Sequence, residues 1–153
     1  MIVSDEIVAG FSALATPTIA NALDDVGFEG VMHGLAQMVA GTRCVGRAAT
    51  VRQVTGRRGD FTSEDFKVGR MIDAAGPGDV LVVDNGGHAV STFGGLAALA
   101  AKVKGVAGLV ADGGVRDREE MIELAFPVFA RHMTPLTGRS RLAVTGLNEV
   151  VSC

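Results

Sequence analysis

The sequence predicts an α/β fold built around a parallel sheet. Three short apolar runs, over residues 80–83, 106–111 and 127–130, have the length and composition of buried strands. Helical patterns lie between them, over residues 92–104 and 117–124. Continuous apolar strands that alternate with helices indicate right-handed β-α-β units, with helices on both faces of the sheet. The carboxyl ends of such strands share one edge, where ligands bind in open parallel sheets.

The N-terminal part of the chain predicts two helices. The first is expected over residues 4–14, and the second over residues 16–25. Thr16 is a good N-cap for the second helix, and Pro17 suits the first helical position. Because 153 residues suit one domain and no linker or repeat interrupts them, we expect a single domain over residues 1–153.

A strand and another helix are expected before the first apolar run. Val, Ala and Thr are frequent over residues 44–54, which is typical of a strand. Either Thr62 or Ser63 can cap a helix that reaches Ala75. The Gly-Pro-Gly sequence at 76–78 then ends that helix.

The charge and hydropathy of the chain limit the kinds of partner it is expected to bind. A formal net charge of −3 gives no basic surface for nucleic acid, and the adjacent pair Arg57 and Arg58 is expected in a solvated loop. No apolar run reaches the roughly 20 residues that span a bilayer, so no membrane partner is expected. The mean hydropathy of +0.34 then predicts burial of apolar surface between subunits.

The two cysteines indicate a reducing compartment. Cys44 and Cys153 have neither the spacing of a metal site nor that of a disulfide framework. No secretory signal pattern precedes the first helix. We therefore expect a cytoplasmic protein.

Three loops are expected to meet at the carboxyl edge of the sheet, over residues 85–95, 112–117 and 131–135. His88 and His132 fall in these loops and are candidates for the site, because histidine often serves in catalysis. For each of them a role outside the site is the more common outcome.

Gly94 and Gly95 stand at the start of an expected helix in the first of these loops. Free N–H groups at a helix N-terminus can hold a carboxylate or a phosphate, and glycine lets such a ligand come close. The same glycines can instead serve close packing of the helix on the sheet.

The second loop carries Arg116, Asp117 and Glu120. A guanidinium can bind a carboxylate or a ketone oxygen, and an aspartate is a hard ligand suited to Mg²⁺ or Mn²⁺. The spacing of Asp117 and Glu120 also fits a capping box, in which the two residues only begin a helix. Both interpretations can hold together.

Several mechanisms lack their motifs. The chain has no G-x-G-x-x-G after a strand, no phosphate-binding G-x-x-x-x-G-K-[ST] and no G-x-S-x-G. The lysines are Lys67, Lys102 and Lys104, and the last two stand near the end of a helix, where lysine usually faces solvent. A Schiff-base mechanism is therefore not expected.

Six segments of the chain, in consistent order, resemble the RraA-like family. The most specific is Gly-Val-Ala-Gly-Leu-Val-Ala-Asp-Gly-Gly-Val-Arg-Asp at 105–117, and the others lie at 16–24, 45–51, 75–84, 94–97 and 127–131. This family includes the regulator of RNase E activity A and the 4-hydroxy-4-methyl-2-oxoglutarate / 4-carboxy-4-hydroxy-2-oxoadipate aldolases. The resemblance implies a swivelling β/β/α-type domain that assembles as a homotrimer or a dimer of trimers.

The aldolase branch is marked by a glycine, twenty residues, Arg-Asp, two residues and an acidic residue. Gly95, Arg116, Asp117 and Glu120 fit this pattern without a gap. Since the regulator branch tends to lack the metal-binding aspartate, Asp117 favours the enzyme.

The resemblance also implies a role for each of these residues. The backbone N–H groups of Gly94, Gly95, Leu96 and Ala97 are expected to bind the substrate carboxylate. Arg116 is expected to contact the 2-oxo acid, and Asp117 to hold the divalent cation partly through water, which makes these two the catalytic residues. Glu120 is expected beside the metal ligand rather than on the metal.

The implied activity is a metal-dependent (class II) aldolase that releases pyruvate from 4-hydroxy-4-methyl-2-oxoglutarate-type 2-oxo acids. Loss of CO₂ from oxaloacetate passes through the same pyruvate enolate, so oxaloacetate decarboxylase activity is expected as well. The alternative is a protein-binding module that resembles the RNase E regulator and has no catalysis.

One departure from the family stands at the end of the chain. Members usually continue past the position of Val150 with a segment that adds strands, whereas this chain ends at Cys153. The C-terminal strands of the family are thus expected to be missing. In the aldolases that region can lend an acidic residue to a neighbouring site, so the acid/base partner stays unassigned.

Overall fold

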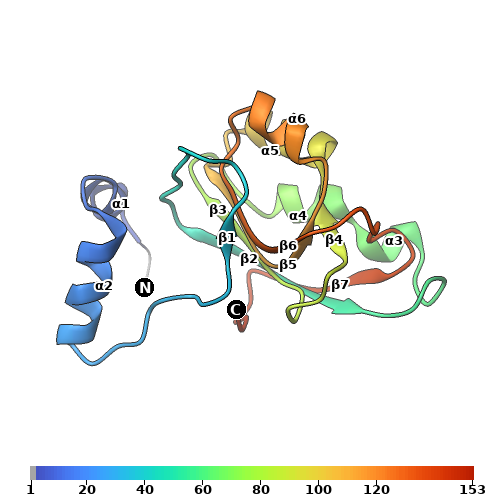
Figure 1. The fold of residues 1–153 in the computed structure, drawn as a ribbon, viewed down its shortest axis with the longest axis horizontal. Helices are drawn as coiled ribbons and strands as arrows, with labels where there is room; N and C mark the ends of the chain where they lie inside the picture. Colours follow the sequence, from blue (N-terminus) through green and yellow to red (C-terminus); the bar gives the residue numbers. More distant parts are fainter. Residues whose placement is uncertain (1–2) are drawn as a thin grey trace. The chain divides into compact units, whose positions relative to one another are not determined.

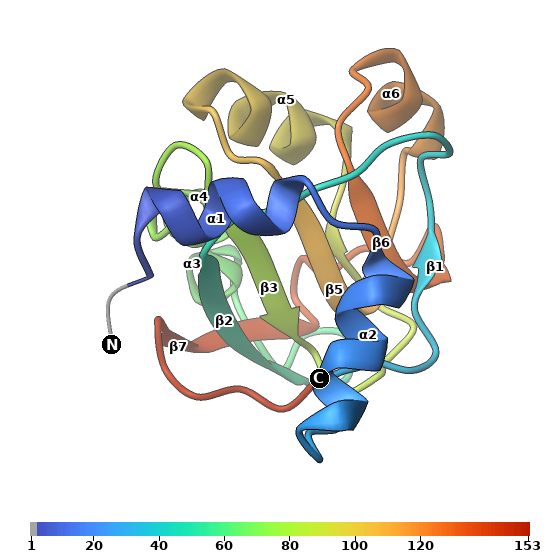
Figure 2. The same cartoon turned by 90° about the vertical axis from the view of Figure 1, so that its left-hand side faces the viewer.

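The computed structural model describes residues 3–153 and divides into two compact units, Met1–Gly34 and Leu35–Cys153. Figures 1 and 2 show the course of the chain in each unit. Within the described residues no helix is long and apolar enough to cross a membrane.

The first unit holds the two expected helices, α1 (Asp5–Ser12) and α2 (Thr16–Asp25). The Oγ of Ser4 accepts the N–H of Ile7 at 3.3 Å and so caps α1. The cap predicted at Thr16 is wrong: Ala15 takes the N-cap position of α2 and no side chain caps the helix. The backbone of Ala15 is extended and the helix begins one residue earlier than predicted, so Thr16 is already helical. Pro17 still lies in the first turn.

The second unit contains a sheet of seven strands in the order β1-β6-β5-β3-β2-β7, with β4 paired to β5 off this path. Its four central strands, β2, β3, β5 and β6, are mutually parallel, and Figure 2 shows them side by side. The edge strands β1 and β7 run antiparallel to β6 and β2. The bounds are Ala36–Gln37 (β1), Ala48–Thr55 (β2), Val80–Asp84 (β3), Ser91–Phe93 (β4), Gly108–Val115 (β5), Val128–Met133 (β6) and Leu142–Leu147 (β7).

The helices of this unit are α3 (Ser63–Phe66), α4 (Val68–Asp73), α5 (Gly95–Lys104) and α6 (Arg118–Glu123). The predicted α/β class and parallel β-α-β units are confirmed. Within this unit, however, α4, α5 and α6 lie in a row on one face of the sheet (Figure 1). The reason is topological: the chain visits β2, β3, β5 and β6 in a single direction, and right-handed crossovers then all fall on the same side.

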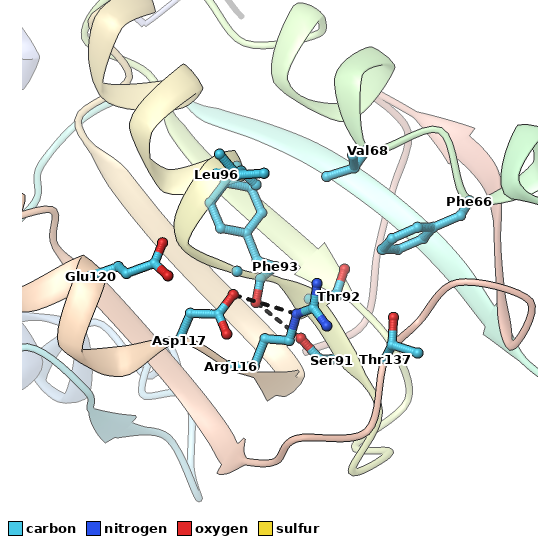
Figure 3. A pocket seen from close by; sticks show the side chains of 12 residues that line it. Phe66, Val68, Ser91, Thr92, Phe93, Leu96, Arg116, Asp117, Glu120 and Thr137 are labelled. Atoms are coloured by element: carbon cyan, nitrogen blue, oxygen red, sulfur yellow. Dashed lines mark hydrogen bonds and ion pairs between the residues drawn. The ribbon is translucent and has the colours of Figure 1, made fainter.

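The single helix predicted up to Ala75 is broken in two. Thr62 caps α3 in a capping box with Asp65, as one of the two predicted caps. Lys67 then adopts a left-handed conformation with φ of 44°, which ends α3 and begins α4. This break separates Phe66 from Val68 and directs both toward the same cavity (Figure 3).

Strand β5 continues well beyond its predicted end at Ala111. It runs through Gly113 and Gly114, which the sequence analysis placed in a loop, to Val115. A Cβ at Gly113 would lie 2.8 Å from the Cβ of Asn85, and one at Gly114 would lie 2.6 Å from the Cγ2 of Thr134. These glycines therefore serve close packing inside the sheet rather than a turn.

The extension of β5 also explains why α5 begins later than the sequence predicted. The helix predicted from residue 92 begins only at Gly95, because residues 91–93 form β4 against the extended end of β5. The core below is tiled from aliphatic side chains such as Leu81, Leu109 and Val128, all fully buried. Phe93 and Phe126 supply its stacked aromatic pair, with ring centroids 6.3 Å apart.

Candidate active site

A cavity of about 310 Å³ opens in the second unit where α5 begins and β5 passes into α6 (Figure 3). Six of the seven residues predicted for the site from the sequence line its wall. The complete wall consists of Phe66, Val68, Ser91, Thr92, Phe93, Gly94, Leu96, Ala97, Arg116, Asp117, Glu120 and Thr137. Gly95 is buried immediately behind this wall.

Asp117 connects the two helices that border the cavity. Its Oδ2 accepts the N–H of Gly95, the first residue of α5, at 3.1 Å. The capping box predicted for Asp117 and Glu120 is wrong: Asp117 occupies the N-cap position of α6, but its side chain caps no N–H of that helix. The backbone of Asp117 is left-handed, with φ of 58° and ψ of 47°, and its carboxylate accepts a hydrogen bond from α5 rather than from α6. An anion at the N-terminus of α5 is favoured by the helix dipole.

Arg116 stands beside that carboxylate. Its backbone N–H donates to the carbonyl oxygen of Phe93 at 3.0 Å, which fixes the residue against β4. Its Nε lies 3.5 Å from Oδ2 of Asp117. The Arg116 side chain is 45% exposed, so most of its donors remain available to a ligand in the cavity.

Gly94 and Gly95 make room for these charged groups. A Cβ at Gly94 would lie 2.6 Å from Oδ2 of Asp117 and 3.1 Å from Nε of Arg116. A Cβ at Gly95 would meet Glu120 at 1.7 Å (Oε2) and 2.9 Å (Cβ). These contacts describe neither of the two roles that the sequence left open: the glycines give room to side chains of residues 116–120 at the start of α5. The neighbours are site side chains rather than the sheet.

The opposite wall is mostly apolar. Leu96 and Ala97 come from the first turn of α5, while Phe66 and Val68 face them from α3 and α4 (Figure 3). The sequence analysis missed Phe66 and Val68, because their position depends on the break between two short helices. The capping box at Thr62 and Asp65 was the only nearby signal.

Two hydroxyls in the wall are already engaged within the protein. The Oγ1 of Thr92 donates to Oε1 of Gln53 at 2.7 Å, and Oγ of Ser91 donates to the carbonyl oxygen of Phe93 at 3.0 Å. Both side chains are buried. They hold β4 in place rather than offering donors to a ligand.

The histidine candidates lie elsewhere. Neither His88 nor His132 lines the cavity. His132 lies on β6 rather than in the expected loop, and a ring nitrogen lies 2.9 Å from the carbonyl oxygen of Gly87, which ties β6 to the loop after β3. Close to it, the buried carboxylate of Asp112 pairs with Arg131, which makes this part of the edge structural.

The residues present fit a magnesium-type ion bound with much of its water. Among residues 3–153 no group of three or more His, Cys, Asp or Glu side chains could hold a metal by itself. Mg²⁺ is usually held by one or two carboxylates, with waters and substrate oxygens completing its shell. Asp117 and Glu120 both approach Gly95, so the cavity offers two hard oxygen donors of this kind.

Comparison with known proteins identifies the family. A family model described as "RraA-like: Aldolase/RraA" matches residues 16–153. The chain belongs to the RraA-like family. The resemblance found in the sequence is thereby confirmed, and the fold is that of RraA proteins: the structure of RraAS2 from Streptomyces coelicolor, described as an unusual member of the RNase ES inhibitor RraA protein family, superposes with a TM-score of 0.84. It is 27% identical, and the match covers 99% of this chain and 75% of that one.

Relatives of this RraA-like chain also carry the aldolase name. A putative 4-hydroxy-4-methyl-2-oxoglutarate aldolase of Halalkalibacterium halodurans is 29% identical over 149 residues, which are 97% of this chain and 66% of that protein. A 4-hydroxy-4-methyl-2-oxoglutarate aldolase of Thermus thermophilus is 35% identical over 94 residues, 61% of this chain and 52% of the relative. The chain thus spans two thirds or less of the length of these relatives.

Proposed function

We propose that this protein is a divalent-metal-dependent aldolase that cleaves 4-hydroxy-2-oxo acids to pyruvate and also decarboxylates oxaloacetate. The observation that carries the proposal is the placement of Arg116 and Asp117 at the N-terminus of α5 in one cavity. A guanidinium, a carboxylate and a helix start together suit a small anion with a carbonyl group. The aldolase names of two relatives support the same reaction.

The backbone of α5 binds the substrate carboxylate in this proposal. The first four N–H groups of a helix have no partner within it. The N–H of Gly95, which the sequence assigned to the substrate, donates to Asp117 instead, so we assign the carboxylate to those of Leu96 and Ala97, which line the cavity. Two N–H groups and the positive end of the helix dipole suit one carboxylate.

Arg116 supplies charge where the reaction develops it. Cleavage of the C3–C4 bond, or loss of CO₂ from oxaloacetate, leaves negative charge on the 2-oxo oxygen of a pyruvate enolate. The guanidinium, held by its backbone bond to Phe93, donates to that oxygen and lowers the energy of the enolate. The apolar side chains of Phe66 and Val68 line the cavity beside it and suit the carbon chain of the substrate.

Asp117, with Glu120 beside it, would hold the cation. When bound, Mg²⁺ or Mn²⁺ supplies Lewis-acid stabilisation of the same developing charge. Asp117 is positioned for this by its bond to Gly95, which restricts the carboxylate to one orientation. The acid/base group is unassigned, since among residues 3–153 the titratable side chains that line the cavity are those of Arg116, Asp117 and Glu120.

We also propose that the protein acts as a homotrimer or a dimer of trimers. Large apolar side chains are exposed on the outer side of α5 and α6: Leu96 is 83% and Val103 80% exposed, and Leu99 and Ile122 are about half exposed. Such a surface beside a binding cavity suits contact between subunits. Light scattering on the wild type and on Val103→Glu tests it, with loss of the oligomer expected in the variant.

A non-catalytic role as a regulator is the second candidate. The close match to RraAS2, named for RNase ES inhibition, favours it. It predicts binding to a ribonuclease with no dependence on metal and none on Asp117.

The decisive experiment measures pyruvate release from oxaloacetate and from 4-hydroxy-4-methyl-2-oxoglutarate, with Mg²⁺ or with chelator. Release that needs Mg²⁺ and is lost in Asp117→Asn is the expected result. Asp73→Asn is the matched control, because Asp73 is exposed and pairs with Lys104 away from the cavity. Release no faster than with Mg²⁺ alone would contradict the aldolase and favour the regulator.

A further inference from the structure

A second cavity, of about 510 Å³, is lined by three arginines and no acidic residue. Arg58 comes from the loop after β2, and Arg139 and Arg141 precede β7. We propose that this arginine hollow, defined by Arg58, Arg139 and Arg141, binds a carboxylate of the substrate that lies remote from its 2-oxo group. The inference rests on the proposed aldolase function and gives it one further subsite, for the end of the substrate opposite its 2-oxo group.

The three guanidinium groups lack a counter-charge. Within residues 3–153, none of Arg58, Arg139 and Arg141 forms an ion pair with a carboxylate. Two of them are held by neutral oxygens instead: Nε of Arg139 donates to Oγ of Ser63 at 3.0 Å, and Nη1 of Arg141 donates to the carbonyl oxygen of Thr137 at 3.2 Å. These bonds orient the arginines and leave their charge uncompensated.

Two carboxylates close in sequence to residues of the hollow accept hydrogen bonds from other groups. Asp65 accepts from the backbone N–H and the hydroxyl of Thr62, both at 2.7 Å, in the capping box of α3. Asp60 accepts the backbone N–H of Arg57 at 2.6 Å. Three arginine side chains without an ion pair in one hollow suit an anion that the hollow receives.

Carboxylate is the chemistry that this arrangement recognises. A guanidinium offers parallel N–H donors that match the two oxygens of a carboxylate. The hydroxyl of Ser63 accepts from Arg139, so its own proton remains able to donate, and Ser140 adds a second hydroxyl. Phe61 forms an apolar part of the wall, which suits the carbon chain of such a ligand.

The hollow adjoins the candidate active site. Thr137 lines both cavities, and its Oγ1 accepts the backbone N–H of Arg139 at 3.2 Å. A Cβ at Gly138 would lie 2.5 Å from the carbonyl oxygen of Ser91 and 3.0 Å from Cε2 of Phe66. The segment 137–138 is thus packed tightly on the active-site wall. In this proposal the ligand binds with its 2-oxo end at Arg116 and extends along this segment toward the hollow.

The test compares ligands with and without the remote carboxylate in Arg139→Gln/Arg141→Gln. We expect KM for 4-hydroxy-4-methyl-2-oxoglutarate to rise about tenfold or more, the usual effect of losing charged hydrogen bonds. Exchange of the pyruvate methyl protons with deuterium, followed by NMR, should stay within about twofold, because pyruvate has no second carboxylate. Arg57→Gln is the control: it removes one positive charge at the position next to Arg58, and Arg57 does not line the hollow.

Direct binding separates this inference from the proposed reaction. Glutarate and inorganic phosphate are titrated by calorimetry into the wild type, Arg57→Gln and the double variant, with thermal unfolding to confirm that each is folded. Glutarate binding that weakens only in the double variant supports the hollow even if no substrate is cleaved, in which case the aldolase alone fails. Equal losses for pyruvate and the dicarboxylates would overturn the inference. So would loss of phosphate binding with unchanged KM, which would make the hollow a free phosphate site.

Discussion

The carboxylate of Asp117 accepts the N–H of Gly95 at 3.1 Å, which joins the start of α6 to the start of α5. The two residues are 22 positions apart, and the bond sets the distance between the helix N-terminus and the side chains of Arg116 and Glu120. The candidate site is therefore held together by one of its own proposed catalytic groups. Experiments therefore have to distinguish the catalytic role of Asp117 from its role in holding the two helices together.

Gly95→Ala tests the close approach of the two helices. The new Cβ would lie 2.9 Å from the Cβ of Glu120 as well as against its carboxylate, so rotation of the flexible end alone cannot relieve the clash. We expect a loss of about 1–3 kcal/mol in the free energy of unfolding, typical of overpacking, together with weaker pyruvate binding. Urea denaturation and pyruvate titration measure the two effects.

Gly69→Ala is the control for that substitution. Gly69 lies in α4, and nothing stands within 4 Å of its Cβ position. Alanine there should leave pyruvate binding unchanged and add about 0.5–1 kcal/mol of stability through helix propensity. Equal behaviour of the two variants would contradict the packing argument.

Substitutions at Asp117 separate charge from backbone strain. The residue has φ of 58°, a conformation that glycine and asparagine also tolerate. We expect Asp117→Gly and Asp117→Asn to fold with melting temperatures close to that of the wild type, because relief of backbone strain in the glycine variant offsets the lost bond. Both should lose metal-dependent pyruvate release. A variant that keeps this activity would remove Asp117 from the catalytic residues.

Ala125 occupies a backbone position that glycine usually fills. It follows the last turn of α6 with φ of 47°, and the N–H of Phe126 donates to the carbonyl oxygen of Met121 at 3.1 Å, as in a Schellman motif. Ala125→Gly removes the steric cost of a Cβ in this conformation. We expect a gain of about 1 kcal/mol in unfolding free energy. Because Ala125 is remote from the cavity wall, KM should not change.

The thiol of Cys153 should react slowly near neutral pH. Burial, and then the negative charges of Asp84 and Asp112, raise its pKa to about 11, while Arg131 opposes them. Alkylation by iodoacetamide in a Cys44→Ser background should accelerate as pH rises toward 11. A rate profile with a midpoint near 9, the ordinary thiol value, would contradict the placement of this residue.

The same pKa shift has a consequence for stability. Because the folded-state pKa lies above the unfolded value of 9.0, the folded state holds the proton more tightly. The stabilisation is complete below about pH 9 and is lost as pH rises toward 11. Cys153→Ser should flatten the fall in melting temperature over this window.

Local patterns in the sequence determined much of this protein. The apolar runs at 80–83 and 127–130 became β3 and β6, because a strand buried on both faces needs continuous aliphatic residues. The family motif from Gly95 to Glu120 named residues that the structure brings into one region. The motif could do so because a family keeps the same spacing between residues on the same helices and strands. Their catalytic roles stay predictions.

Tertiary structure decided what these patterns left open. The spacing of Asp117 and Glu120 fits a capping box, yet the carboxylate of Asp117 binds Gly95 on another helix, because local spacing cannot register a partner 22 residues away. The sequence Gly113-Gly114 is typical of a loop, but both residues lie in β5. They are glycines because a Cβ would clash with Asn85 or Thr134, which is a contact that only the folded structure reveals. The arginine hollow joins Arg58 to residues about 80 positions later, a neighbourhood that exists only once β2 pairs with β7.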